Sequence, residues 1–151
     1  MTFLFPGSFD PPTIGHADII ERMSHLSEKL YVGVLVNVKK KCKYTVEQRQ
    51  EMLERIAGSF SNVEVVSFDG LLVDAAKRLG VDAIVKGLRN SVDFQYESEM
   101  AQVNLTISGI ETFYIQANPS YAIVSSSIVR ELSAFNGDIT GFVPECILDL
   151  L

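Results

Sequence analysis

Hydrophobic residues along the chain follow two alternating patterns. Continuous apolar runs, rich in β-branched residues, are typical of strands buried on both faces, and they predict five strands, at residues 2–5, 30–36, 63–68, 81–85 and 112–116. Between and after them, apolar residues recur at helical spacing, which predicts helices at residues 14–26, 45–58, 71–79, 93–107 and 125–135 and a short one at 144–151 with Pro144 in its first turn.

Two of the helical stripes are well marked, and one helix start is also clear. The helix at 14–26 aligns Ile19, Ile20, Met23 and Leu26, and the helix at 93–107 aligns Tyr96, Met100, Val103 and Ile107. Thr45, with Gln48 three residues later, has the spacing of a capping box.

The alternation of strands with helices predicts an α/β fold. We expect one domain, residues 1–151, with a Rossmann-like, doubly wound, mostly parallel five-stranded sheet and helices on both of its faces. Ligands of such sheets bind at the carboxyl ends of the strands, where the strand order reverses. The strand-to-helix loops are therefore the place to seek function, here residues 6–13, 37–44, 68–70, 86–92 and 117–125.

Composition narrows the class of protein. A chain of 151 residues that is 47% hydrophobic and has a net charge of −6 can bury an ordinary core and is a poor candidate for nucleic-acid binding. Its two cysteines lack the spacing of a zinc site or a redox pair, and no apolar stretch has the length of a membrane span. We therefore expect no metal centre, no membrane contact and a cytoplasmic location. One local exception is that Lys39, Lys40, Lys41 and Lys43 gather four of the thirteen basic residues in one loop.

The first loop has the clearest chemical signal. Residues 7–16, Gly-Ser-Phe-Asp-Pro-Pro-Thr-Ile-Gly-His, follow a strand and open a helix, where free N–H groups and the helix dipole favour an anion. The sequence is neither a Walker A loop nor a GxGxxG dinucleotide fingerprint. His16 could donate a hydrogen bond to a phosphate oxygen; the alternative is that it only caps the helix.

Three other loops offer groups that suit phosphate. They are the lysine loop, the Lys86-Gly87-Leu88-Arg89 segment after a predicted strand, and the three hydroxyls of Ser125–Ser127 at a helix N-terminus. The alternatives are a solvated lysine face, an ion pair of Arg89 with Asp93 or Glu97, and simple capping. The sequence contains no nucleophile elbow and no evident catalytic carboxylate pair, so the pattern favours direct transfer between phosphates, with positioning and charge stabilisation as the source of catalysis.

Four blocks in this order and spacing resemble bacterial phosphopantetheine adenylyltransferases, over nearly the whole chain. They are residues 7–16, Lys40-Lys41 ahead of Tyr44-Thr45, residues 86–97, and residues 124–131 with the sequence Val-Ser-Ser-Ser-Ile-Val-Arg-Glu. The TxGH element at residues 13–16 alone marks only the wider nucleotidyltransferase superfamily.

The resemblance implies an enzyme that transfers the adenylyl group of ATP to 4′-phosphopantetheine with Mg²⁺, giving dephospho-coenzyme A and pyrophosphate without a covalent intermediate. It implies catalytic roles for His16, Lys40 and Arg89, and a homohexamer. The positions that match ATP contacts are Ser8, Phe9, His16, Gly87, Leu88, Arg89, Glu97, Tyr121, Ala122, Ile123, Val124, Ser125, Ser126 and Ser127. Those that match phosphopantetheine contacts are Ser8, Lys40, Leu72 and Lys86.

The chain departs from the family pattern at two positions. Lys86 stands where the family usually has Arg, which removes a bidentate grip on phosphate, and Val38 stands where Pro is usual, so either Lys39 or Lys40 could take the family's lysine role. We prefer Lys40, counting back from Tyr44. The alternatives are another nucleotidyltransferase, such as a cytidylyltransferase, and a non-catalytic nucleotide-binding module, which would have no reason to keep His16 and Lys40 together.

Overall fold

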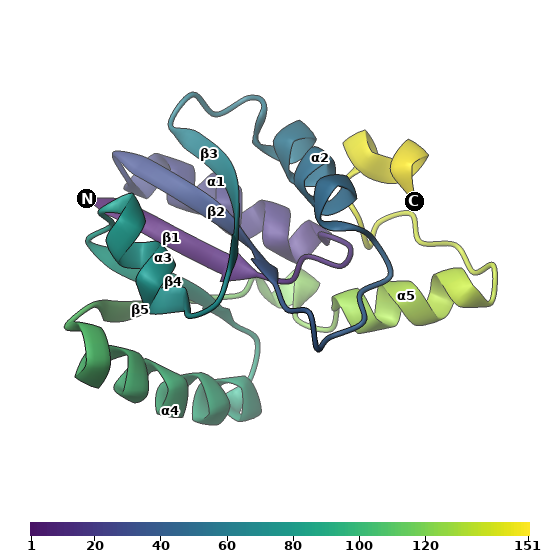
Figure 1. Cartoon of the computed structure of the whole chain (residues 1–151). Helices are drawn as coiled ribbons and strands as arrows, with labels where there is room; N and C mark the ends of the chain where they lie inside the picture. Colours follow the sequence, from purple (N-terminus) through teal and green to yellow (C-terminus); the bar gives the residue numbers. More distant parts are fainter.

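A fully parallel five-stranded sheet forms the centre of the molecule. The computed structural model describes all residues, 1–151, and its strand order is β3-β2-β1-β4-β5 (Figure 1). The strands are β1 (Thr2–Gly7), β2 (Lys29–Val36), β3 (Val63–Asp69), β4 (Ala83–Leu88) and β5 (Glu111–Gln116). The helices are α1 (Ile14–Leu26), α2 (Val46–Ala57), α3 (Leu72–Leu79), α4 (Ser91–Ser108) and α5 (Ser126–Ala134), with 3-10 turns η1 (Pro119–Tyr121) and η2 (Glu145–Leu150).

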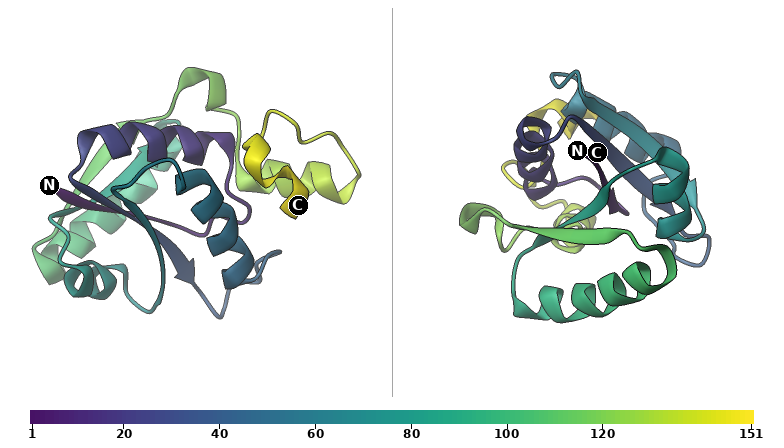
Figure 2. Two further views of the ribbon diagram at one scale, coloured as in Figure 1. Left: turned by 90° about the horizontal axis from the view of Figure 1, so that it is seen from above. Right: turned by 90° about the vertical axis from the view of Figure 1, so that its left-hand side faces the viewer.

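Helices cover both faces of the sheet, which confirms the doubly wound α/β prediction. Alternate residues of β1 point to opposite sides: Phe3 and Phe5 belong to a large core with residues of α1 and α2, whereas Leu4 packs with Ala76 and Ile84 in a small core on the other side. Helices α3 and α4 lie on that second side (Figure 2). The strand order reverses between β1 and β4, so the predicted ligand edge lies beside these two strands.

Two strands, β1 and β4, differ from the prediction by more than one residue at an end. Strand β1 continues through Pro6 and Gly7 because its parallel pairing with β2 extends to Gly7↔Val34. Strand β4 covers residues 83–88 rather than 81–85. The Val81 N–H is taken by the Ala76 carbonyl at the end of α3, and Lys86, Gly87 and Leu88 continue the pairing with β5. Lys86 is therefore a strand residue, not a loop residue.

The two marked apolar stripes differ in their burial. In α1, Ile19, Ile20 and Met23 of the stripe are buried, as predicted. Leu26 at the end of α1 is 72% exposed. In α4 the stripe of Tyr96, Met100, Val103 and Ile107 is exposed, and no residue of the helix is buried. The less exposed positions of α4 are polar or small: Asp93, Glu97, Ser98, Ala101, Asn104 and Ser108. The apolar stripe of α4 thus points away from the sheet.

The C-terminal segment also differs in kind from the prediction. Residues 145–150 form a 3-10 helix, and Pro144 precedes it instead of sitting in its first turn. Ile147 of this segment is buried in the large core, and η2 packs on α2. None of the helices combines the length and the apolar character needed to cross a bilayer.

Candidate active site

A cleft of about 410 Å³ lies at the carboxyl ends of β1 and β4, where the strand order reverses. Its walls come from the first loop, the start of α1, the end of β4, the start of α4 and the start of α5. Thirteen of the residues predicted from the sequence line it: Ser8, Phe9, His16, Lys40, Lys86, Gly87, Arg89, Glu97, Tyr121, Val124, Ser125, Ser126 and Ser127.

Four predicted residues do not line this cleft. Leu72 packs beside the small core on the far face of the sheet, and Leu88 pairs with Gln116 in β5. Ala122 ends the η1 turn, and the Ile123 side chain is 77% exposed. The substrate contacts expected of these four stay predictions.

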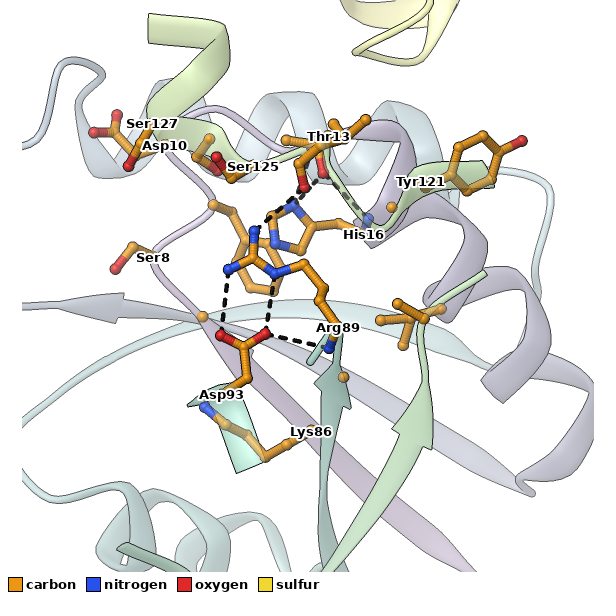
Figure 3. Close-up of a pocket in the computed structure, with 18 of the residues that line it drawn as sticks. Ser8, Asp10, Thr13, His16, Lys86, Arg89, Asp93, Tyr121, Ser125 and Ser127 are labelled. Carbon is orange, nitrogen blue, oxygen red and sulfur yellow. Dashed lines mark hydrogen bonds and ion pairs between the residues drawn. The ribbon is translucent and has the colours of Figure 1, made fainter. Parts of the chain in front are cut away.

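His16 is both a helix cap and a cleft residue, so the two interpretations from the sequence are compatible. The Thr13 N–H donates to His16 Nδ1 over 3.0 Å, and the Thr13 hydroxyl accepts from the His16 backbone N–H, which makes a reciprocal capping box. Because Nδ1 accepts this bond, the ring proton of neutral His16 is on Nε2. His16 can therefore offer one N–H donor to the cleft (Figure 3).

The environment of His16 keeps the ring neutral. Burial, followed by the positive charges of Arg89 and Lys86, lowers the pKa of His16 from 6.5 to about 4. The His16 and Phe9 rings pack in an edge-to-face arrangement with 5.0 Å between their centroids. The Phe5 ring also lies near His16, at 6.4 Å between centroids. At neutral pH the group is thus a hydrogen-bond donor without a charge.

Lys40, rather than Lys39, is the lysine of its loop that lines the cleft. Its Nζ lies 3.3 Å from the Ser8 hydroxyl and has no carboxylate partner. Lys43 instead contacts the Ser133 hydroxyl on α5. The geometry supports the preference for Lys40, because its charge is uncompensated and lies beside the first loop.

The other two predicted cations are already paired. Lys86 Nζ lies 3.2 Å from Glu97 Oε1. The Arg89 guanidinium is paired with the Asp93 carboxylate at 3.1 Å (Figure 3). The ion-pair interpretation of Arg89 is correct, with Asp93 as the partner. Both cations still line the cleft, so an anion there would compete with these carboxylates for them.

The three serines divide their tasks. Ser125 caps α5 by accepting from the Ile128 N–H, Ser126 donates its hydroxyl to the Pro11 carbonyl, and Ser127 accepts from Arg130. The Ser126 bond ties α5 to the first loop. The start of α5 is thus held against the first loop, and both contribute to the walls of the cleft.

The sequence did not predict a polar framework around the first loop, two members of which, Asp10 and Arg130, also line the cleft. Buried Asp10 accepts the N–H groups of Lys43 and Tyr44, while Arg130 donates to the Asp10 carbonyl over 2.6 Å. Buried Arg49 donates to the Ser8 carbonyl over 2.7 Å. These bonds fix the lysine loop and α5 against the first loop. They join residues far apart in sequence, so no local pattern could reveal them.

The carboxylates of the cleft do not assemble a metal centre. No group of three or more His, Cys, Asp or Glu side chains has the arrangement of a metal site. Asp10 is occupied by backbone N–H groups, and Asp93 and Glu97 are paired with cations. A divalent ion in this cleft would therefore take most of its ligands from the oxygens of a bound phosphate compound and from water.

Comparisons with known proteins agree with this geometry. The family model for cytidylyltransferase-like proteins matches residues 4–132. The phosphopantetheine adenylyltransferase of Streptomyces coelicolor is 47% identical over 146 residues, covering 97% of this chain and 92% of that protein. The protein of the same name from Thermobifida fusca is also 47% identical, covering 97% and 89%. One from Clostridium perfringens is 42% identical over 147 residues, covering 97% and 90%.

The region that the family model matches contains the sheet from Leu4 onward and every residue that lines the cleft. The identity is high and extends over nearly the full length of the chain. The structure places the TxGH histidine, His16, at the switch point of the sheet, so the sequence comparison and the fold lead to the same family. The chain belongs to the phosphopantetheine adenylyltransferase family, within the cytidylyltransferase-like group.

Proposed function

We propose that this chain transfers the adenylyl group of ATP to 4′-phosphopantetheine, giving dephospho-coenzyme A and pyrophosphate. The observation that supports it most is that one cleft is lined by two groups suited to phosphate. They are a neutral His16 donor at the start of α1 and the uncompensated Lys40 cation beside Ser8. Such a site suits two phosphate compounds whose charges must be brought together.

The reaction is a single displacement. An oxygen of the phosphopantetheine phosphate attacks the α-phosphorus of ATP, a new O–P bond forms, and the bond to the β-phosphate breaks with its electron pair on pyrophosphate. The attacking oxygen is already anionic, so no proton has to be removed. Lys40 offsets the charge of the two phosphates as they approach, and the His16 Nε2–H donates to an α-phosphate oxygen.

The state of His16 fits this scheme. A general base needs a free lone pair, but Nδ1 accepts from the Thr13 N–H and Nε2 holds the proton. A ring with a pKa of about 4 would also be a weak base at neutral pH. His16 is therefore suited to stabilising negative charge on the α-phosphate as a neutral hydrogen-bond donor.

We propose that Mg²⁺ enters the cleft as part of the nucleotide substrate. Mg²⁺ keeps several waters and is usually bound by substrate phosphates with one or two carboxylates. The carboxylates at the cleft are engaged with cations or N–H groups, which suits an ion held mainly by the triphosphate. The ion would offset phosphate charge there, beside Lys40 and Arg89. Because the proposed substrate ATP is a metabolite of the cytoplasm, we also propose a cytoplasmic location.

An assay of pyrophosphate release tests the substrate assignment. ATP or CTP is combined with 4′-phosphopantetheine or with another phosphate monoester, in four separate mixtures. The proposal expects release only with ATP plus phosphopantetheine. Release with CTP and a different acceptor would favour the cytidylyltransferase alternative, and nucleotide binding without release from any pair would favour the non-catalytic module.

We also propose that the chain assembles into a homohexamer. Helix α4 has its polar and small residues toward the sheet and its apolar residues, including Tyr96, Met100 and Val103, toward solvent. An apolar helix face on an otherwise acidic chain is best covered by identical copies of the chain.

Light scattering coupled to size exclusion tests this assembly. The wild-type chain should elute with six times the mass of one chain, and Val103→Lys on α4 should reduce that mass. Leu26→Lys is the matched control, because Leu26 is an exposed apolar residue on a helix at the other face of the sheet and should leave the mass unchanged. A monomeric wild-type chain would contradict the proposal.

A further inference from the structure

A buried hydroxyl lies next to the ion pair at the edge of the cleft. Lys86 on β4 and Tyr114 on β5 are register partners, and Lys86 is paired with Glu97 on α4. The Tyr114 ring packs edge-on against Phe94 at 5.7 Å between centroids. Phe94 and Glu97 are three residues apart, on one side of α4, so the Tyr114 ring lies beneath the helix turn that holds Glu97.

The Tyr114 hydroxyl is buried and has no hydrogen-bond partner. A buried donor without an acceptor is costly and uncommon in folded proteins. The Glu97 carboxylate lies close enough to act on this hydroxyl, since burial and then the Glu97 charge raise the pKa of Tyr114. In this state, however, the Glu97 carboxylate is engaged by Lys86.

Lys86 has a second possible partner, because it lines the cleft where the substrate phosphates are proposed to bind (Figure 3). If Lys86 turns toward a phosphate, Glu97 loses its cation and becomes an uncompensated carboxylate at the edge of an anion site. Such a charge would repel the substrate.

We propose that Tyr114 is a positioning residue that donates its hydroxyl hydrogen bond to Glu97 when Lys86 leaves Glu97 for a substrate phosphate. The exchange replaces one partner of Glu97 by another. It holds the carboxylate against β5 and out of the path of the phosphate. This inference rests on the proposed function only for the identity of the phosphate; the exchange of partners itself can be tested without substrate.

The ligand-free test uses thermal unfolding of four proteins at one concentration: the wild type, Tyr114→Phe, Lys86→Met and the double variant. In the wild-type background, Tyr114→Phe removes an unpaired buried hydroxyl and should raise the unfolding midpoint by about 2–4 °C. In a Lys86→Met background, Glu97 has lost its cation and accepts from Tyr114, so the same Tyr114→Phe change should lower the midpoint. An equal shift in both backgrounds would overturn the proposal.

Steady-state kinetics provide a second readout. Tyr114→Phe should raise KM for 4′-phosphopantetheine roughly fivefold and leave kcat nearly unchanged, because a hydrogen bond to a carboxylate is lost in the bound state only. The matched control is Thr112→Val, since the Thr112 hydroxyl is also buried and unpaired on the same side of β5 but is two residues from Tyr114. This control should leave KM unchanged.

The outcomes separate the two proposals. An unchanged KM in Tyr114→Phe, or an equal rise in Thr112→Val, overturns the role of Tyr114. Absence of turnover in the wild-type chain overturns the proposed function instead, and the comparison of unfolding midpoints still decides whether Glu97 exchanges partners.

Discussion

His16 has few chemical options because its surroundings fix its tautomer, its charge and its direction. The Thr13 N–H donates a hydrogen bond to Nδ1, and burial and two neighbouring cations keep the ring neutral. The Phe9 ring packs against it in an edge-to-face contact. The remaining function is a single N–H donor aimed into the cleft. Removal of that donor should therefore affect the transition state more than the binding of substrates.

We expect His16→Ala to lower kcat by about 10²–10³-fold with a modest change in KM, as for the loss of one transition-state donor. His25→Ala is the matched control, since His25 packs on Phe60 and does not line the cleft. Steady-state pyrophosphate release measures both. Near-normal turnover of His16→Ala would remove His16 from the mechanism.

The lowered pKa of His16 also predicts how stability depends on pH. The unfolded chain protonates His16 near 6.5 and the folded chain only near 4, so between these values the unfolded state binds more protons. Neutral His16 therefore favours the folded state. This contribution to the free energy of unfolding is fully present above pH 6.5 and is lost as the pH falls to about 4; by pH 5 about 2 kcal/mol of it is gone.

Urea unfolding of the wild-type chain and of His16→Asn between pH 7 and 4 measures this contribution. The free energy of unfolding of the variant should fall less steeply with decreasing pH, because Asn does not titrate. Parallel curves for the two proteins would show that His16 is not held neutral in the folded state.

Lys40 and Lys41 are neighbours in sequence with different environments. Lys40 reaches Ser8 at the cleft, whereas Lys41 does not line it. Lys40→Ala should lower kcat/KM at least about 30-fold more than Lys41→Ala, because only the first removes a cation from the reacting phosphates. Equal losses in a kinetic comparison would indicate that only the total charge of the loop matters.

At the scale of elements, the cleft depends on close contact between β4 and α1. A Cβ on Gly87 would lie 2.4 Å from Ile19 Cδ1, much closer than carbon atoms can approach, so Gly87 lets the end of β4 lie against the buried side chain of α1. The start of α1 holds His16, and the end of β4 leads to Arg89. The contact therefore sets the distance between two of the proposed catalytic groups.

Gly87→Ala should lower the free energy of unfolding by about 1–3 kcal/mol and reduce activity, because Ile19 has to move. The double variant Gly87→Ala with Ile19→Val removes the clashing methyl group and should recover most of both losses. Urea unfolding and turnover measure the two effects. No recovery in the double variant would show that the clash is not with Ile19.

Which elements could be predicted from the sequence depends on whether their signal is local. Both capping boxes depend on residues three apart. The sequence predicts the box of Thr45 with Gln48, whereas for His16 it offers capping only as the alternative to a ligand role. The end of β4 depends on pairing with β5, which lies nearly thirty residues away. The outward direction of the α4 stripe could not be predicted, because periodicity marks an apolar face of a helix but not what that face packs against.

At the scale of the whole molecule, the net charge of −6 conceals a cleft with several cations. The sheet topology explains this contrast, since parallel strands bring the loops after β1, β2 and β4 to one edge although they are far apart in sequence. This is why the main site residues could be predicted once the α/β pattern was recognised. The framework of Asp10, Arg49 and Arg130 could not, because its bonds exist only after the chain has folded.

We propose that the cleft brings two phosphates together for direct transfer, without a covalent enzyme intermediate. The stereochemistry at the transferred phosphorus tests it most directly. ATP made chiral at its α-phosphorus by one sulfur atom is converted with 4′-phosphopantetheine, and the configuration of the product is determined. A single displacement predicts inversion. Retention would require two displacements through an adenylylated side chain and would contradict the account.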